Sequence, residues 1–175
     1  MKELILGGAR SGKSAYAERC VLATGKLPVY VATGWADNEE MAQRIAQHRA
    51  DRGDTWLLVE EPLHLAQALL TVDAPGRALV VDCLTLWLSN CLHMGDWQAA
   101  RDRLRQVLPL LTADIYLVSN EVGSGIVPLG PLPRRFVDEA GWLHQALAQL
   151  CDQVTLVVAG LPLTLKTLPE AGGTS

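Results

Sequence analysis

Short apolar runs alternate along this 175-residue chain with longer stretches in which apolar positions recur every three or four residues. Most of the short runs are rich in valine, isoleucine and leucine without regular polar alternation, as is typical of parallel strands covered on both faces. They predict strands at Glu3–Leu6, Val29–Ala32, Trp56–Val59, Ala78–Val81, Ile115–Val118 and Val154–Ala159. The longer stretches predict helices at Lys13–Ala23, Asn38–Ala50, Leu63–Leu70, Thr85–Cys91, Trp97–Leu108 and Arg134–Leu150. This alternation predicts an α/β fold: a mostly parallel sheet with helices on both faces and ligands beyond the carboxyl ends of the strands.

The loop between the first predicted strand and the first predicted helix carries a specific motif. Residues 7–14 read GGARSGKS and fit the pattern G-x-x-x-x-G-K-[ST], in which backbone N–H groups and the helix N-terminus bind phosphate. Lys13 would reach the outer phosphates, and the Ser14 hydroxyl would hold Mg²⁺. The flanking strand and helix disfavour the alternative, a glycine-rich turn with an incidental lysine. We therefore predict a P-loop NTPase-like fold with nucleotide contacts from Gly7, Gly8, Ala9, Arg10, Ser11, Gly12, Lys13 and Ser14.

Length and composition predict a single domain over residues 1–175, with a flexible tail at residues 169–175. Hydrophobic residues make up 49% of the chain and charged residues 19%, which suits a substantial core and argues against disorder. The net charge of -4 and the lack of a lysine or arginine block argue against nucleic acid as the main partner, whereas a small nucleotide is compatible with both.

The sequence favours a cytoplasmic protein without a membrane span. Its longest charge-free apolar stretch near the end, Val154–Leu165, is too short and too interrupted to cross a bilayer. Because a strand is predicted almost at the first residue, we expect no signal peptide. None of the four cysteines forms a C-x-x-C pair, and we interpret them as buried thiols in a reducing compartment.

Two further candidate features lie at the predicted carboxyl ends of strands. Asp82 directly follows the apolar run Leu79–Val81, where a phosphate-loop protein places the carboxylate that orients Mg²⁺ or its water. The same side chain would also suit the N-cap of the helix predicted from Thr85, and the two roles are compatible.

The segment Glu121–Pro133 contains three glycines and three prolines and is long for a compact domain, so it is either functional or mobile. The stretch Asn120–Pro128 places polar groups and glycines at the carboxyl end of a predicted strand, and we interpret it as an active-site loop rather than a plain turn.

Among the four histidines, His48 is the strongest candidate for chemistry. It shares a predicted helix face with Arg44 and is followed by Arg49 and Arg52, so it suits a group that meets phosphate. The plainer alternative is a solvated surface position. We expect His64 on the surface, in the first turn of a predicted helix, and His93 in a loop before Gly95. His144 is expected on a helix, where it would face either a cleft or solvent.

Several segments taken together resemble one known family. They are GGARSGKS, VATG after the second predicted strand, EEMAQRIAQHRADR, W…EEP, VVDCLT, SNEVGSGIVP and R-x-F-x-D-x-x-G. From the first strand to Leu165-Lys166, the chain resembles the bifunctional adenosylcobinamide kinase / adenosylcobinamide-phosphate guanylyltransferase family. The RIAQHRADR and NEVGSGIVP segments make the resemblance specific, because the phosphate loop alone is generic. The resemblance implies a transferase of cobalamin (vitamin B12) biosynthesis that phosphorylates adenosylcobinamide with GTP or ATP. It would then transfer GMP from GTP, through a guanylylated histidine, to give adenosylcobinamide-GDP.

The resemblance also implies roles for individual residues. The family's histidine falls on His48 within RIAQHRADR, and Lys13 would act with it on the phosphates of GTP. Nucleotide contacts outside the phosphate loop would come from Ala32, Thr33, Gly34, Arg49, Ala50, Asp51, Arg52, Glu60 (or its neighbour Glu61) and Asp82. Mg²⁺ would be held by Ser14 and Asp82, directly or through water. The family further implies a homotrimer and a corrinoid substrate, and His144 departs from its G-x-x-N-Q pattern.

Two other functions remain open from the residues themselves. A kinase acting on another small alcohol would need the phosphate loop and Asp82 but not His48. A nucleotide-dependent switch would bind and hydrolyse GTP without an acceptor, although the chain lacks a T-K-x-D-type guanine-reading sequence. Transfer to an acceptor with release of pyrophosphate distinguishes the bifunctional enzyme from a switch that releases phosphate alone.

Overall fold

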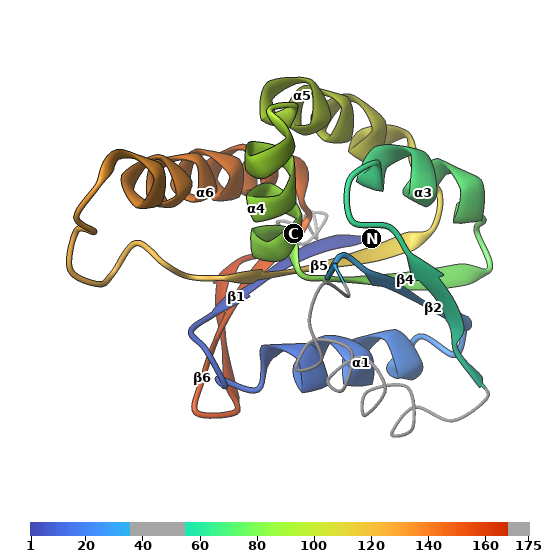
Figure 1. Cartoon of the computed structure of the whole chain (residues 1–175). Helices are drawn as coiled ribbons and strands as arrows, with labels where there is room; N and C mark the ends of the chain where they lie inside the picture. The colour runs from blue at the N-terminus through green and yellow to red at the C-terminus, as the bar shows by residue number, and fades with distance from the viewer. Residues whose placement is uncertain (36–54, 168–175) are drawn as a thin grey trace, which may run out of the picture.

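The computed structural model describes residues 1–35 and 55–167, whose strands form one seven-stranded sheet (Figure 1). The strands are β1 (Lys2–Gly7), β2 (Leu27–Ala32), β3 (Leu57–Glu60), β4 (Arg77–Asp82), β5 (Asp114–Asn120), β6 (Gln153–Val158) and β7 (Leu161–Lys166). They lie in the order β3-β2-β4-β5-β1-β6-β7. Neighbouring strands from β3 to β6 run parallel, and β7 at the edge runs antiparallel to β6. The predicted mostly parallel sheet is confirmed.

Helices cover both faces of this sheet, as the sequence predicted (Figure 1). One face is covered by α1 (Lys13–Ala23). On the opposite face lie α3 (Leu65–Val72), α4 (Leu84–Met94), α5 (Trp97–Val107) and α6 (Pro131–Leu150). Each crossover connection returns the chain to the same end of the sheet. The carboxyl ends of the parallel strands therefore all lie at the opposite end, next to one another.

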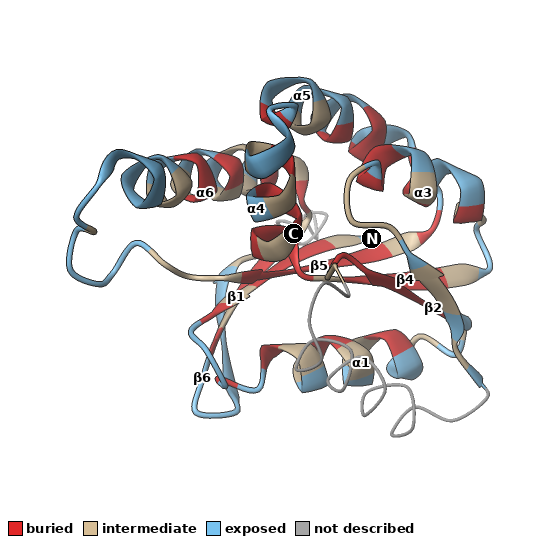
Figure 2. Ribbon diagram, in the orientation of Figure 1, coloured by how far each residue is buried: buried red, intermediate tan, exposed pale blue. Residues whose placement is uncertain are grey.

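Burial on both faces explains why the strands read as continuous apolar runs. Neighbouring residues of a strand point to opposite faces, so Leu4 packs in the core beneath α3 to α6, whereas Ile5 packs in the core against α1. Figure 2 shows buried residues along the sheet and on the inner sides of the helices. The indole rings of Trp87 and Trp97, whose centroids lie 5.3 Å apart edge to face, join α4 to α5.

Two element predictions are corrected at the end of the chain. The strand β7 was not predicted, because its side chains are mostly exposed and Pro162 interrupts the apolar run. Proline is tolerated there because β7 is an edge strand, one side of which has no strand partner among residues 1–35 and 55–167. The helix α6 begins at Pro131 rather than at Arg134, and proline suits the first turn of a helix, where no intrahelical donor is needed.

The prediction that His93 lies in a loop is wrong. The helix α4 continues to Met94 and ends at Gly95, whose φ of 78° provides a left-handed C-cap, so His93 is an exposed residue of the last helical turn. The predicted helix Asn38–Ala50 and the tail 169–175 lie outside the described residues, and the single domain stays a prediction. In the described part of the chain, no helix is both long and apolar enough to cross a membrane.

Candidate functional site

The loop between β1 and α1 has the shape of a phosphate-binding loop. Arg10 and Gly12 have φ angles of 56° and 91°, in the left-handed region. Successive residues that alternate in this way aim their backbone N–H groups into one concave surface, which attracts anions. No described side chain caps the N-terminus of α1, so the first N–H groups of the helix are available to a ligand.

Two polar groups in the loop fit a negatively charged ligand. The Lys13 side chain is only 8% exposed, and its Nζ donates to the carbonyl oxygen of Gly8 at 3.1 Å. A phosphate oxygen is a stronger acceptor for an ammonium group than this neutral carbonyl. Ser11 Oγ is buried without a hydrogen-bond partner among the described residues, although buried hydroxyls are normally paired. An anion in the loop would give the Lys13 ammonium a charged acceptor in place of this carbonyl.

Close packing explains the two glycines that the motif fixes. A Cβ atom on Gly7 would collide with Ser11 Oγ and lie 2.7 Å from the carbonyl oxygen of Val157. A Cβ on Gly12 would lie 3.1 Å from Gly160 Cα, and the φ of Gly12 disfavours any side chain. Both glycines are therefore required by the fold around the loop as well as by the approach of a ligand.

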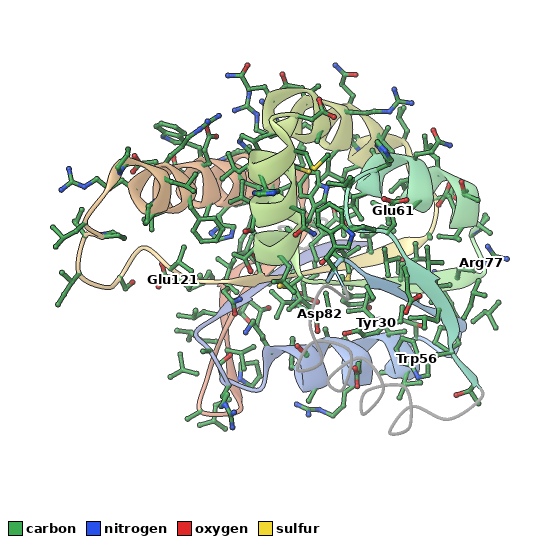
Figure 3. The ribbon with its side chains drawn as sticks, viewed as in Figure 1. Tyr30, Trp56, Glu61, Arg77, Asp82 and Glu121 are labelled. Carbon is green, nitrogen blue, oxygen red and sulfur yellow. The ribbon has the colours of Figure 1, made fainter. Side chains whose placement is uncertain are left out.

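Asp82 lies at the carboxyl end of β4, on the same edge of the sheet as the loop, with β5 between β4 and β1. Its Oδ2 accepts a hydrogen bond of 2.8 Å from the Tyr30 hydroxyl, and Figure 3 shows the two side chains close together on the α1 side of the sheet. Its second predicted role is wrong: the N-cap of α4 is Cys83, and no side-chain cap bond is formed. The hydroxyl of Ser14 and the carboxylate of Asp82 are hard oxygen donors of the kind that Mg²⁺ prefers, so these residues fit that ion.

The segment after β2 is fixed by buried hydrogen bonds. Thr33 is fully buried, its N–H donates to the Asp82 carbonyl at 3.2 Å, and its Oγ1 donates to the Cys83 carbonyl at 2.7 Å. Asn90 on α4 donates from Nδ2 to the carbonyl oxygens of Thr33 and Pro62, at 2.9 and 3.1 Å. This asparagine ties the ends of β2 and β3 together and was not singled out from the sequence, where the only signal was an amide side chain in a mostly apolar helix.

The two glutamates that follow β3 have different environments. Glu60 ends the strand with an exposed side chain and pairs in register with Ala32. Glu61 donates its backbone N–H to the Ala32 carbonyl, and its Oε1 accepts the N–H groups of Leu63 and His64 at 3.0 and 2.8 Å. The Glu61 carboxylate is thus hydrogen-bonded to backbone N–H groups at the start of α3, toward which it points in Figure 3.

The loop after β5 begins beside the phosphate loop. The N–H of Glu121 donates to the Gly7 carbonyl at 3.0 Å, and Asn120 Nδ2 donates to Thr85 Oγ1 at 2.9 Å. The Glu121 carboxylate accepts the N–H groups of Gly123 and Ser124. Burial alone would raise the pKa of Glu121, but these donors hold it below its usual value. The predicted active-site loop therefore starts at the site, while most of its later residues are exposed.

His144 faces the protein interior, so of the two predicted orientations the one toward solvent is not adopted. Its Nε2 lies 2.7 Å from the hydroxyl of the fully buried Ser119, which precedes Asn120 on β5. Burial lowers the pKa of His144, and the nearby Glu121 partly opposes that shift. His64 is exposed at the N-cap of α3, as predicted.

The structure thus brings part of the predicted site together. Gly7 to Ser14, Ala32 to Gly34, Glu60 and Asp82 all lie at or just beyond the carboxyl ends of the strands. The remaining predicted residues lie outside the described part of the chain: His48, Arg49, Ala50, Asp51 and Arg52.

Comparisons with known proteins agree with the family resemblance seen in the sequence. A family model described as cobinamide kinase / cobinamide phosphate guanyltransferase matches residues 3–165. The bifunctional adenosylcobalamin biosynthesis protein CobP of Pseudomonas aeruginosa is 54% identical over 172 residues, which cover 97% of this chain and 99% of the relative. The bifunctional adenosylcobalamin biosynthesis protein CobU of Escherichia coli is 35% identical over 182 residues, covering 95% of this chain and all of the relative.

A solved structure supports the fold independently of close sequence similarity. The flagellar accessory protein FlaH from Methanocaldococcus jannaschii superimposes with a TM-score of 0.52 at 13% identity, covering 95% of this chain and 78% of that protein. At this identity the likeness concerns the fold alone. Together with the loop between β1 and α1, it supports the predicted P-loop NTPase-like architecture.

Proposed function

The chain belongs to the cobinamide kinase / cobinamide phosphate guanyltransferase family, and we propose that it is a bifunctional transferase of cobalamin (vitamin B12) biosynthesis. In the first reaction it transfers the terminal phosphate of GTP or ATP to the aminopropanol hydroxyl of adenosylcobinamide. In the second it transfers GMP from GTP to adenosylcobinamide phosphate, which gives adenosylcobinamide-GDP and pyrophosphate. The observation that carries the proposal is the phosphate loop, in which Arg10 and Gly12 adopt left-handed angles and Lys13 donates to a neutral carbonyl group.

In the phosphoryl transfer, the chain binds and orients the nucleotide. The N–H groups of the loop and Lys13 would hold the outer phosphates and stabilise the charge that spreads over their oxygens in the transition state. Mg²⁺, held by Ser14 and Asp82, would supply additional positive charge at the same oxygens. The acceptor oxygen forms the new P–O bond to the γ-phosphorus while the bond from that phosphorus to the leaving GDP or ADP breaks, and the hydroxyl proton passes to solvent.

In the guanylyl transfer, we assign His48 as the nucleophile. A neutral imidazole nitrogen would attack the α-phosphorus of GTP, so that a P–N bond forms as the P–O bond to pyrophosphate breaks. An oxygen of adenosylcobinamide phosphate would then displace the imidazole. Arg49 and Arg52 carry positive charge that would neutralise the phosphate oxygens during both displacements. This assignment rests on the motif RIAQHRADR.

The rest of the nucleotide site is assigned to the ends of β2 and β3. Ala32, Thr33 and Gly34 are assigned by the family motif VATG, and the hydrogen bonds from the buried Thr33 to the Asp82 and Cys83 carbonyls hold this segment next to the end of β4, which supports its part in the site. Between the two glutamates we favour Glu60, because its side chain is exposed while the carboxylate of Glu61 is bound to the N-terminus of α3. Ala50 and Asp51 belong to the same segment as His48 and are assigned by motif alone.

We further propose that the enzyme is cytoplasmic and acts as a homotrimer on its corrinoid substrate. Support for an assembly comes from the outer strand of the sheet. Leu161 and Leu163 of β7 alternate along the strand, so they share one face, and each is more than half exposed; Leu165, exposed to a similar extent, lies at the register shift of the β6–β7 pair. An exposed apolar edge strand is uncommon in a protein that stays monomeric.

The test uses GTP labelled in turn at the α- and γ-phosphate, with the purified protein and Mg²⁺ but without an acceptor. We expect the protein to retain the α-label and not the γ-label, and the label to be released by acid. His48→Asn should retain no label, whereas the matched variant His64→Asn, altered at an exposed histidine, should label like wild type.

The same variants then separate the two reactions. His48→Asn should still pass the γ-label to adenosylcobinamide, because the phosphoryl transfer does not use the histidine. Folded wild-type protein that takes no covalent label would remove His48 from the catalytic residues and leave a kinase or a nucleotide-dependent switch. Loss of both reactions in a folded His48→Asn protein would contradict the separate roles.

A further inference from the structure

The turn that joins β6 to β7 has an unusual backbone. Val158 pairs with Leu161, which leaves only Ala159 and Gly160 in the turn. Both have positive φ angles, 52° and 78°, as a two-residue hairpin turn of the I′ type requires. Alanine is disfavoured in this conformation, because its Cβ crowds the backbone. A conformation that costs free energy persists where the surrounding structure holds it in place.

This turn contacts the back of the phosphate loop. The N–H of Gly160 donates a hydrogen bond of 2.8 Å to the carbonyl oxygen of Ser11. A Cβ on Gly12 would lie 3.1 Å from Gly160 Cα, so the two segments pack backbone against backbone. Next to the turn, the Val157 carbonyl lies so close to Gly7 that no side chain fits between them. Figure 1 shows the turn of the β6–β7 hairpin beside the loop that precedes α1.

The hydrogen bond to Ser11 has a consequence for the far side of the loop. In a planar trans peptide the C=O of one residue and the N–H of the next point in opposite directions. When Gly160 holds the Ser11 carbonyl toward the hairpin, the N–H of Gly12 is turned away from the hairpin. The N–H groups of a phosphate loop make its contacts with phosphate, so the orientation of this peptide affects nucleotide affinity.

We propose that Gly160 is a positioning residue for nucleotide binding, because its N–H fixes the peptide between Ser11 and Gly12 in the orientation that binds phosphate. The proposal rests on the proposed function, in which both reactions use a nucleotide held by this loop. It assigns the hairpin of β6 and β7 a part in the site, although no side chain of the hairpin is in the motif. A merely structural role for the turn would change stability but not nucleotide affinity.

The sharpest test removes the N–H of Gly160 without adding a side chain. Cys151 allows native chemical ligation of residues 1–150 to a synthetic segment 151–175, in which glycolic acid replaces Gly160 so that an ester oxygen stands in place of the N–H. The refolded full-length chain is compared with an identically ligated all-amide chain. We expect the Kd for GTP to rise about three- to tenfold, the range set by one hydrogen bond. The KM for GTP should rise by a similar factor in both reactions, with kcat little changed.

Two recombinant variants provide the controls. Gly160→Asn keeps the N–H and tolerates a positive φ, and there is open space around the added Cβ, so it should bind GTP like wild type. Gly160→Val keeps the N–H but disfavours the turn conformation, so it should raise the Kd for GTP as the ester does. If the ester chain does not refold, the test is the difference in the Kd for GTP between Gly160→Val and Gly160→Asn.

The outcomes separate the inference from the proposed function. If the folded ester protein or the folded Gly160→Val protein binds GTP as tightly as wild type, the positioning role is overturned and the proposed function stays intact. Wild-type protein that itself does not bind GTP overturns the proposed function. Lower thermal stability of Gly160→Val with an unchanged Kd would identify a structural turn only, and would likewise overturn the inference.

Discussion

The two ends of the sheet are built in opposite ways. At the amino ends of the strands, aspartates tie the chain together. Asp73 accepts the N–H groups of Thr112 and Ala113 at 2.8 to 3.0 Å, and Asp152 accepts the N–H of Lys2 at 2.7 Å. Asp114 binds both the amino terminus and Lys26 at 2.7 Å. In this region the acceptors are occupied by groups of the protein itself.

The carboxyl ends leave polar groups for a ligand instead. There the loop residues adopt left-handed angles, Ser11 Oγ is buried without a partner among the described residues, and Lys13 donates to a neutral carbonyl. The contrast is therefore between the aspartates at the amino ends, whose acceptors bind the protein itself, and the phosphate loop at the carboxyl ends. Substitutions of these aspartates should change stability alone, and substitutions in the phosphate loop should mainly change activity.

The largest expected effect is that of Lys13→Ala at the carboxyl end. Both reactions should fall by about two to three orders of magnitude in kcat/KM, because the ammonium group stabilises phosphate charge in each. The free energy of unfolding should change by less than about 1 kcal/mol, because the substitution removes only the hydrogen bond from Lys13 Nζ to the Gly8 carbonyl oxygen. Kinetics with each substrate and urea unfolding of the same preparation measure the two effects. Retained activity in either reaction would contradict the role of the loop.

The matching substitution at the amino end is Asp73→Ala. It leaves the N–H groups of Thr112 and Ala113 without their acceptor, which should cost about 1 to 2 kcal/mol of unfolding free energy. Activity well below the melting temperature should be unchanged. The control is Asp102→Ala, which removes an exposed carboxylate on α5 paired with its neighbour Arg101 and should be nearly neutral. A lowered kcat/KM in folded Asp73→Ala would contradict the separation of the two ends.

The sequence was most informative where function depends on local backbone geometry. The phosphate loop could be predicted because Gly7, Gly12 and Lys13 stand at fixed spacings within one strand–loop–helix unit. The six parallel strands followed from their continuous apolar runs, which reflect burial on both faces. Asp82 was found at the end of such a run, but its bond to Tyr30 joins two strands and leaves no mark on the local pattern.

Contacts between distant segments could not be predicted in this way. The hairpin turn at Ala159 and Gly160 reaches Ser11 through backbone atoms, so no residue type signals the contact. Asn90 acts through an amide that bonds two carbonyl groups from other loops, a pattern that exists only after the chain has folded. The same holds for the pair of Ser119 and His144, which joins β5 to α6.

The smallest expected effect is that of His144, which lies near the carboxyl ends of the strands but is hydrogen-bonded to Ser119 of the protein itself. Its pKa is lowered by burial, so between the folded and the unfolded pKa the unfolded chain binds more protons. The stability that this group contributes is therefore complete above about pH 6.5 and is lost as the pH falls through the folded value. His144→Asn should flatten the fall in unfolding free energy that accompanies a decrease in pH below about 6.5.

The control for this effect is His64→Asn, which alters an exposed histidine and should leave the slope as in wild type. Glu121 acts in a separate window: its pKa is lowered, so its contribution is complete above about pH 4.5 and is lost only as the pH falls further. Urea unfolding at closely spaced pH values measures the slopes, and titration with GTP at pH 7 should give the same Kd for His144→Asn and wild type. A wild-type slope in His144→Asn would show that the buried imidazole does not set the pH dependence. A changed Kd for GTP would place His144 among the residues that serve the ligand rather than the fold.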